Sequence, residues 1–329
     1  MKLFNMIAFL VAVCQVTSCQ QKAETTSQDI DGIDHWEASL YVEMQNKLGE
    51  GAIYNYVTRE FWHIDIEGKS FYTTRVDDKK QRQFEVGQRI GTIVPSDSNR
   101  AVVALQDGIY SYSLLSNEMN LICSPEDTIP NIRYNDGKCD SQGRLWVGSM
   151  GLNQKKYRAS LYSIAYGEPR QRLDSITISN GIVWSGDNQT MYYTDTPDGN
   201  VKAFDFDEKT GDISNKRIVI EIGELGFPDG MAIDAEGMLW IALWNGNMVG
   251  RWDPSTGQLI GKVSVPAHNI TSCAFVGDSL DSLIITTARV DMSDDELKAN
   301  PLSGSLFVVV PGVRGVKSHF YQMAPENQP

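Results

Sequence analysis

The sequence predicts an all-β fold, a six-bladed β-propeller with four-stranded antiparallel blades. The main observation is a short run of aromatic and β-branched residues that recurs six times, usually after a turn. The runs begin at Phe61, Ala101, Leu145, Met191, Leu239 and Leu283, which gives steps of 40, 44, 46, 48 and 44 residues. A period of roughly 40–50 residues with several strands per unit is typical of propeller blades. A β-sandwich with evenly spaced turns is the alternative, and the regular period disfavours it.

Within each unit, turn sequences separate the predicted strands. Residues 140–143, 185–188 and 234–237 are rich in Asp, Ser and Gly, and each precedes one of the recurring runs. These residues favour β-turns between antiparallel strands. In the fifth unit, residues 249–253 and 258–265 supply the third and fourth strands. We therefore expect every unit to contain an oxygen-bearing loop, a first strand at the channel, a turn, a second strand and two further strands.

The two ends of the chain are expected to close the ring. Residues 37–43 resemble an outer strand, and residues 304–310 and 315–321 are expected to supply the final strands. Sharing one blade between the two ends would remove free strand edges. The one predicted helix covers residues 294–300 and ends before Pro301. No linker interrupts residues 37 to 324, so we assign residues 37–329 to a single propeller domain.

The N-terminus reads as an export signal. Lys2 is followed by a largely apolar stretch over residues 3–13 and then by Val-Thr-Ser-Cys at residues 16–19. This pattern predicts a lipoprotein-type signal peptide over residues 1–18, a lipidated Cys19 and a flexible tether over residues 19–36. A plain secretory signal is the alternative, and the apolar run is too short for a membrane-spanning anchor. We expect an exported bacterial lipoprotein held by Cys19 at a periplasmic or outer-membrane surface.

The net charge and the cysteine content exclude several classes of partner and a disulfide-based fold. The formal net charge is −13, which argues against nucleic acid and against anionic lipid as partners of the body. Cys123, Cys139 and Cys273 remain after the signal and the lipidation site, and they form no CxxC pair, so a disulfide framework is not expected. Cys139 and Cys273 fall in predicted first strands and are expected to be buried thiols. We expect a monomer.

Four pairs of an acid or amide with a glycine stand at the head of predicted first strands. They are Glu50-Gly51, Asp136-Gly137, Asn180-Gly181 and Asp229-Gly230. In a propeller these side chains would converge on one mouth of the central channel. A ring of carboxylate and amide oxygens without histidine or thiol suits a hard divalent cation. Such an ion can polarise a carbonyl and lower the pKa of water, so an enzyme is the leading interpretation.

Other catalytic chemistries find no support in the sequence. The four histidines fit no Ser-His-Asp arrangement, and the chain has no Gly-x-Ser-x-Gly, phosphate-loop or dinucleotide motif. His63 lies beside Trp62 in a predicted strand and is expected to be a packed or exposed strand residue, not a catalyst. His268 precedes the sixth unit and is a weaker candidate for the channel mouth. Trp184 and Trp244 are expected in the core.

A series of short motifs runs along the chain: Leu-Gly-Glu-Gly at 48–51, Arg-Tyr-Asn-Asp-Gly-Lys at 133–138, Gly-Arg-Leu-Trp-Val-Gly-Ser-Met at 143–150, Ser-Asn-Gly-Ile-Val-Trp at 179–184, Tyr-Tyr-Thr-Asp-Thr at 192–196, Pro-Asp-Gly-Met-Ala-Ile-Asp-Ala-Glu-Gly at 228–237, Leu-Trp-Ile-Ala at 239–242 and Thr-Ser-Cys-Ala at 271–274. In these motifs, from about Leu48 to Arg289, the chain resembles the SMP-30/gluconolactonase/regucalcin-like family of six-bladed propellers. Each motif alone is weak, and their order makes the set specific.

The resemblance implies a role for each matching residue. Glu50, Asn180 and Asp229 would be the metal ligands, and Asp229 would also be the general base. The implied substrate contacts are Arg133, Asn135 and Asn153. Asp136 and Lys138 would orient their loop from behind these residues. Calcium is the first choice of cation, and magnesium, manganese and zinc also suit such a site. Residues 151–153 depart from the family pattern, because Asn153 stands where some relatives carry an acid.

The function implied is a divalent-metal-dependent hydrolase that opens a sugar lactone to its acid, as a gluconolactonase does. A phosphotriesterase-like activity at the same metal is the alternative within enzymes. A non-catalytic lipoprotein that binds a sugar or a cation is the alternative outside them. The complete set of Glu50, Asn180 and Asp229 favours catalysis. A panel of lactones would separate these hypotheses.

Overall fold

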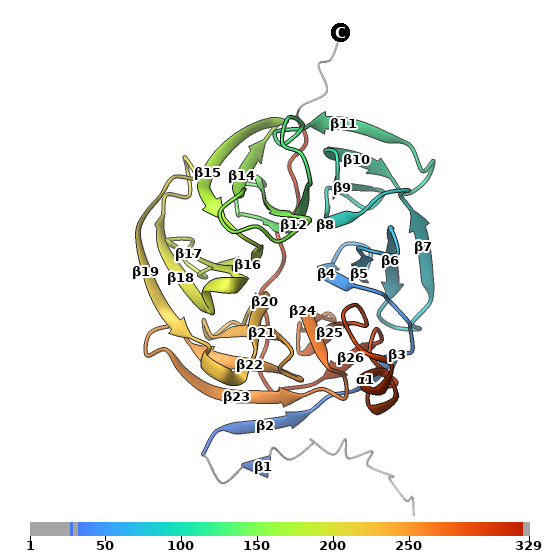
Figure 1. Cartoon of the computed structure of the whole chain (residues 1–329), viewed down its shortest axis with the longest axis vertical. Coiled ribbons are helices and arrows are strands. Elements are labelled where there is room, and N and C mark those ends of the chain that lie inside the picture. The colour runs from blue at the N-terminus through green and yellow to red at the C-terminus, as the bar shows by residue number, and fades with distance from the viewer. Residues whose placement is uncertain (1–26, 29–31, 325–329) are drawn as a thin grey trace, which may run out of the picture.

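The structure is a computed structural model that describes residues 27–28 and 32–324, and it confirms the six-bladed propeller (Figure 1). Each blade is an antiparallel sheet whose first strand lies nearest the central channel. The first three blades contain β4 (Gly49–Asn55), β5 (Glu60–Asp65), β6 (Ser70–Arg75) and β7 (Gln81–Glu85); β8 (Ile90–Pro95), β9 (Arg100–Leu105), β10 (Ile109–Ser113) and β11 (Met119–Cys123); and β12 (Ile132–Cys139), β13 (Leu145–Gly151), β14 (Ala159–Ala165) and β15 (Glu168–Ile176).

The last three blades continue around the ring. They contain β16 (Ser179–Trp184), β17 (Thr190–Asp195), β18 (Asn200–Phe206) and β19 (Ile213–Glu221); β20 (Phe227–Ile233), β21 (Leu239–Trp244), β22 (Met248–Asp253) and β23 (Gln258–Ser264); and β24 (Asn269–Val276), β25 (Ser282–Ala288), β26 (Leu306–Val309) and β3 (Ser39–Val42). Two short 3₁₀ turns, η1 (Thr196–Asp198) and η2 (Gly223–Leu225), lie between strands.

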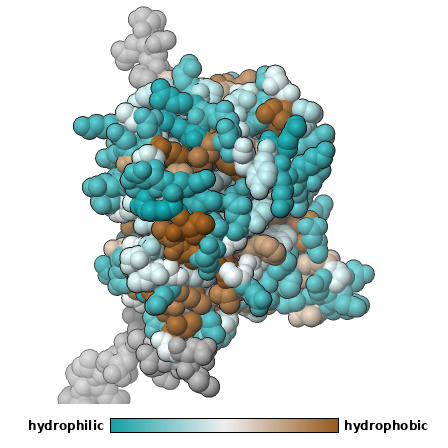
Figure 2. Space-filling view, turned by 60° about the vertical axis from the view of Figure 1, so that its left-hand side comes forward, coloured by the Kyte–Doolittle hydropathy of each residue, from teal (hydrophilic) through white to brown (hydrophobic). Residues whose placement is uncertain are grey.

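The recurring runs of the sequence form the second strand of every blade, as predicted. Their apolar residues are buried between neighbouring blades, and Phe61, Leu145 and Leu239 have no exposed surface. Burial of this kind stabilises by roughly 1.5–3 kcal/mol for each large apolar side chain. The core is therefore a ring of inter-blade layers around the channel. In the face shown in Figure 2, hydrophilic residues cover most of the surface and hydrophobic residues gather in small patches.

The two ends of the chain share the sixth blade, as predicted, and only the segment after residue 314 differs from the prediction. β3 pairs with β26, so an N-terminal strand completes the sixth blade. Residues 315–321 were expected to add a final strand, and this expectation is wrong. They cross the far mouth of the channel, where the Gly315 amide donates to the Leu280 carbonyl at 2.8 Å and the Tyr321 amide donates to the Pro95 carbonyl at 2.8 Å. The reason is that β3 already fills the outer position of that blade. We call residues 315–322 the C-terminal strap.

The remaining elements lie at the edge of the ring. β2 (Asp34–Glu37) runs parallel to β23, and β1 (Ser27–Gln28) pairs with β2, so pairing begins before residue 37. The predicted helix is α1 (Asp294–Ala299), with a Ser293 capping box. Within the part of the chain that is described, no helix is long and apolar enough to span a membrane. The predicted signal and Cys19 lie outside the described residues.

Every inner strand changes register at the same level of the channel. The shifts lie between Glu50 and Ile53, Ile90 and Thr92, Tyr134 and Gly137, Ser179 and Ile182, Pro228 and Met231, and Ile270 and Ser272. A bulge of this kind bends a strand and changes the direction of its side chains. The six shifts divide the channel into a half near the open mouth and a half near the C-terminal strap.

Candidate metal centre and substrate cavity

The four acid-glycine and amide-glycine pairs lie inside the inner strands, where loops were expected. They occur on β4, β12, β16 and β20, at the register shifts. Gly51 has φ +62°, a conformation that favours glycine. A Cβ at Gly181 would lie 2.5 Å from the backbone oxygen of Asp229, so only glycine lets these two blades approach each other. The glycines therefore allow the polar side chains before them to converge.

Three buried carboxyl groups meet near the open half of the channel. The side chains of Glu50, Asp136 and Asp229 are each less than 8% exposed. Burial raises the pKa of Glu50, and the charges of Asp229 and Asp136 raise it further. Burial and the charge of Asp136 likewise raise the pKa of Asp229. These acids repel one another when ionised, so the site favours a bound cation.

The donor atoms fit a hard divalent ion. Asp229 Oδ1 and Asp136 Oδ2 have no hydrogen-bond partner although both are buried. Asn180 Nδ2 donates to Thr196 Oγ1 at 2.8 Å, which fixes the orientation of the amide and leaves its oxygen on the other side. Carboxylate and amide oxygens are the ligands that calcium and magnesium prefer. Glu50, Asn180 and Asp229 could therefore hold such an ion together with water or substrate.

This set depends on the amide of Asn180. Among the described residues, no group of three or more His, Cys, Asp or Glu side chains is arranged to hold a metal ion. Glu50 and Asp229 supply only two carboxylates, so the third protein oxygen has to come from Asn180. Asn180 Oδ1 also accepts a hydrogen bond from Asn135 Nδ2 at 3.1 Å. The substrate-contact residues are thereby joined directly to the metal-ligand residues.

The predicted ligands and two of the predicted substrate contacts line one cavity of about 630 Å³. Arg133 donates to Asn135 Oδ1 at 2.6 Å, and Asn135 Nδ2 donates to the Ser179 carbonyl at 2.7 Å. Burial lowers the pKa of Arg133 to about 10, so its guanidinium is still charged at neutral pH. The volume lies in the range of roughly 300–1,000 Å³ that is typical of small-molecule sites.

Other predicted residues lie outside this cavity. Asn153 is exposed on the loop after β13, and its neighbours Leu152 and Gln154 line the cavity instead. Lys138 lies in the half of the channel near the C-terminal strap, and its ammonium donates to the Met231 carbonyl. Asp136 is buried beside the ligands, where its Oδ1 accepts from the Gly137 amide at 2.7 Å. Asp136 therefore lies behind the ligand residues, where it can orient them without lining the cavity.

None of the four histidines lines the substrate cavity. His63 is fully buried in β5, and its ring stacks on Tyr72 at a centroid distance of 4.9 Å, so of the two expected places, packed or exposed, it takes the packed one. His268 lies beside α1, with Nε2 4.0 Å from Glu296 Oε1, and does not line the cavity. Cys139 and Cys273 are buried free thiols, as expected.

The apolar wall of the cavity is not apparent from the sequence. Trp244 was expected in the core, but it lines the cavity together with Leu152 and Phe227, and Phe227 is 48% exposed. Thr196 was also missed, although it orients Asn180 and its hydroxyl donates to the Pro228 carbonyl at 2.8 Å. Position in the blade is the signal that could have found them. Phe227 directly precedes the Pro-Asp-Gly motif, and Thr196 and Trp244 end or follow second strands at the mouth.

Comparisons with known proteins agree with the fold and the motifs. The model of the family described as SMP-30/Gluconolactonase/LRE-like region matches residues 48–289. The Bacillus subtilis protein YvrE, provisionally named a sugar lactone lactonase, is 33% identical over 82% of this chain and 94% of its own length. Regucalcin from Danio rerio is 33% identical over 85% of this chain and 96% of its own length.

Solved structures give the same result. A calcium-binding protein from Agrobacterium tumefaciens, named regucalcin, superimposes with a TM-score of 0.84 and 27% identity, covering 88% of this chain and 99% of that one. A luciferin-regenerating enzyme superimposes with a TM-score of 0.81 and 28% identity, covering 87% of this chain and all of that one. The family match spans most of the propeller and includes β4, β16 and β20, the three inner strands that carry the candidate ligands. The chain therefore belongs to the SMP-30/gluconolactonase/LRE-like family.

Proposed function

We propose that this protein is a divalent-metal-dependent hydrolase that opens a sugar lactone to its acid. The observation that carries the proposal is the buried pair Glu50 and Asp229, which lies with Asn180 in the same cavity as Arg133 and Asn135. The names of the relatives, which include a sugar lactone lactonase and a calcium-binding protein, support the reaction and the type of cation. Calcium is the first candidate, and magnesium, manganese and zinc are the others.

Each group of these residues has a separate role in the proposed lactone opening. A divalent cation held by Glu50, Asn180 and Asp229 would supply Lewis-acid polarisation of the lactone carbonyl and a lowered pKa for water. Asp229 would also accept the proton of the attacking water, as a buried carboxylate beside the cation. Arg133 and Asn135 hold and orient the substrate through their charge and amide groups. The ring of Trp244 offers an apolar face to the carbon-bound hydrogens of a sugar.

Asn153 has a more distant role in this proposal. Its side chain is exposed, and its Oδ1 accepts from the Lys155 amide at 3.3 Å. From the rim it can reach only an outer hydroxyl of a substrate. Asp136 and Lys138 support the part of β12 that carries Asn135. Their substitution should therefore alter the orientation of Asn135 more than the reaction itself.

A lactone panel tests the proposal. The purified protein is treated with a chelator, single divalent metals are added back, and acid release from aldonolactones is followed with a pH indicator. The proposal predicts no turnover after chelation and recovery with one or more metals. Turnover that persists after complete chelation would show that the reaction does not require a metal. No turnover with any lactone or ester would favour the non-catalytic sugar- or cation-binding protein.

A phosphotriesterase-like activity is the second candidate. The observation that favours it is the apolar wall of Leu152, Phe227 and Trp244, which could accommodate an aryl leaving group. An aryl phosphotriester in the same panel separates the two activities. Faster turnover of the triester than of any lactone would make it the main activity.

We also propose an exported, lipid-anchored location, based on the sequence of residues 1–19. The wild-type protein should be found with the membrane fraction, and Cys19→Ser should release an active protein. Wild-type protein found soluble in the exported fraction would indicate a plain secretory signal instead.

A further inference from the structure

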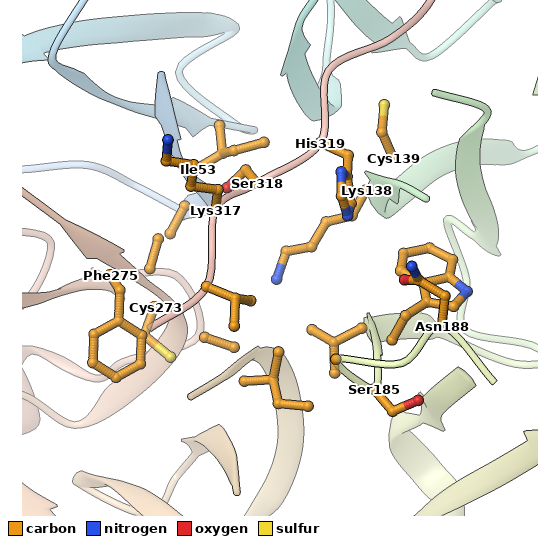
Figure 3. Close-up of a pocket in the computed structure, with 18 residues that line it drawn as sticks. Ile53, Lys138, Cys139, Ser185, Asn188, Cys273, Phe275, Lys317, Ser318 and His319 are labelled. Carbon is orange, nitrogen blue, oxygen red and sulfur yellow. The ribbon is translucent and has the colours of Figure 1, made fainter. Parts of the chain in front are cut away.

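Side chains from neighbouring blades hold the inner strand β20 on both sides of Asp229. On the open side, the Thr196 hydroxyl donates to the Pro228 carbonyl at 2.8 Å. On the other side, the Lys138 ammonium donates to the Met231 carbonyl. Lys138 extends into a second cavity of about 310 Å³, which lies near the C-terminal strap and is lined by none of the predicted metal ligands (Figure 3). Of the two contacts, only that of Thr196 continues to another predicted ligand.

The contact of Thr196 belongs to a hydrogen-bond chain with a fixed direction. The Pro228 carbonyl can only accept, so the Thr196 hydroxyl commits its one proton to that oxygen. Thr196 Oγ1 can then only accept, and it accepts from Asn180 Nδ2 at 2.8 Å. The amide of Asn180 therefore has its nitrogen toward Thr196 and its oxygen on the side where a cation would need it.

The backbone around Asn180 is fixed from the same segment. The buried Asp195 carboxylate accepts from the amides of Thr177 and Ile178, at 2.9 and 2.8 Å. The Thr196 amide donates to the Ile178 carbonyl at 3.1 Å. Asp195 ends β17, and Thr196 begins η1 directly after it. Two consecutive residues therefore hold both the strand that carries Asn180 and the side chain of Asn180 itself.

The first blade, which lies across the channel from the fourth in Figure 1, gives an internal comparison. There the Asp65 carboxylate accepts from the amides of residues 47 and 48, at 3.0 and 2.9 Å. The Ile66 amide donates to the carbonyl of residue 48 at 2.9 Å. Glu50 thus has the same backbone support as Asn180, but the apolar side chain of Ile66 cannot orient it. A carboxylate presents an oxygen in either orientation and an amide in only one, so the hydroxyl occurs where the ligand needs orienting.

We infer that Thr196 is a positioning residue for the metal centre, because its hydroxyl turns the Asn180 amide so that Oδ1 faces the cation. The inference rests on the proposed metal-dependent function, and it names a residue that acts on the ion through a ligand. Without the hydroxyl, Asn180 Nδ2 loses its acceptor, and the amide can turn its NH₂ group toward the ion. Both hydrogens of that group are donors and repel a cation, so the affinity for the metal falls.

Calcium affinity, measured by competition with a chromophoric chelator, tests the inference. Thr196→Val keeps the shape of the side chain without the hydroxyl, and the dissociation constant should rise roughly three- to tenfold, as one neutral hydrogen bond contributes. Thr196→Ser keeps the hydroxyl and should stay close to wild type. Thr194→Val is the matched control, because it removes from the same strand a buried hydroxyl that donates to the Asn200 carbonyl at 2.8 Å. This control should lower the melting temperature and leave the calcium affinity unchanged.

A double-mutant cycle separates positioning from support of the fold. Asn180→Asp presents an oxygen in either orientation, so adding Thr196→Val to it should leave calcium affinity unchanged. An equal loss in both backgrounds, or an equal loss in Thr194→Val, would overturn the inference, because a weakened strand would then explain the effect. Circular dichroism confirms that each variant is folded.

The same measurement distinguishes this inference from the proposed function. Wild type and Thr196→Val that bind calcium equally well would refute the role of Thr196 and leave the metal centre in place. If calcium does not bind, the variants are compared with whichever of magnesium, manganese and zinc the wild type binds. Wild type that binds none of the four metals would overturn the metal centre and this inference with it.

Discussion

Around the open mouth, the inner strands β4, β12 and β20 bring together Glu50, Asp136 and Asp229, all buried and all acidic. A few residues further along, the same strands line a cavity that contains Lys138 and no carboxylate. The two halves share strands, blade geometry and apolar packing. Their difference comes from the register shift in each inner strand, which separates the residues that serve one half from those that serve the other.

This comparison shows how a symmetric ring can carry asymmetric chemistry. All six inner strands have the shift, but β8 and β24 have Gly91 and Thr271 at that level and contribute neither acid nor amide. The scaffold thus supplies six equivalent positions, and only some carry ligands. Because acids cluster only in the open half, changes there should affect catalysis, whereas changes elsewhere should affect stability or the second cavity.

The largest expected effect comes from Asp229→Asn in the open half. The change keeps size and an oxygen donor but removes the charge and the proton acceptor. We expect a fall of roughly 10²–10⁴-fold in kcat for lactone opening, measured with saturating metal. A near-normal rate would mean that Asp229 serves only as a ligand. Asp291→Asn, at the rim of the same cavity, is the matched control.

The next effect concerns the stability of the protein with and without bound metal. Burial and then the charge of Asp229 raise the pKa of Glu50, so an ionised Glu50 is unfavourable without a cation, and Glu50→Gln should raise the melting temperature of the chelated protein. Wild type should gain about 2.7 kcal/mol of stability at a metal concentration one hundredfold above its Kd. The variant should gain much less at the same concentration. Equal gains in both proteins would show that Glu50 is not a ligand of the metal.

Arg133→Ala should affect substrate binding more than chemistry. Arg133 lines the cavity and supports Asn135, but it is not among the candidate metal ligands. We expect kcat/KM to fall roughly ten- to a hundredfold, mainly through KM. Arg89→Ala is the matched control, because Arg89 lines the same cavity but its Nε is paired with Glu67 at 2.7 Å. A fall in kcat alone would give Arg133 a role in the transition state.

The smallest effect lies outside both halves, at His63 in β5. Burial lowers the pKa of His63 to about 3, below its ordinary value of 6.5. The unfolded chain therefore binds the proton first, and stability is lost as pH falls from 6.5 toward 3. The loss should reach about 2 kcal/mol at pH 5. Chemical denaturation at pH 7 and pH 5 should show a smaller loss for His63→Gln, which keeps an acceptor for Asn46.

Much of the fold follows from local sequence. The second strands are found by period because their residues are buried on both faces, so Phe61 and Trp62 stand next to each other as one apolar run. β3 is found because a ring of blades leaves no free edge. The C-terminal strap is missed because residues 315–321 have strand-like composition, and only the prior occupation of the blade by β3 excludes them.

The candidate site likewise contains residues that the sequence reveals and residues that it does not. The convergence of Glu50, Asn180 and Asp229 on one cavity can be predicted, because the glycine after each is required where neighbouring strands approach closely and leaves a visible motif. Trp244 and Phe227 are missed because a mouth-facing aromatic and a core aromatic look the same in sequence. Lys138 is placed next to Asn135 by sequence, yet the register shift between them sends it into the other half of the channel.

Metal stoichiometry tests the central claim most directly. Wild-type protein and Glu50→Gln are loaded with calcium, freed of unbound ion and measured by elemental analysis. One ion per chain in wild type, with clearly less in the variant, is the predicted result. Loading is repeated with magnesium, manganese and zinc, and a wild-type stoichiometry of zero with all four metals would contradict the assignment of Glu50, Asn180 and Asp229 as a metal centre.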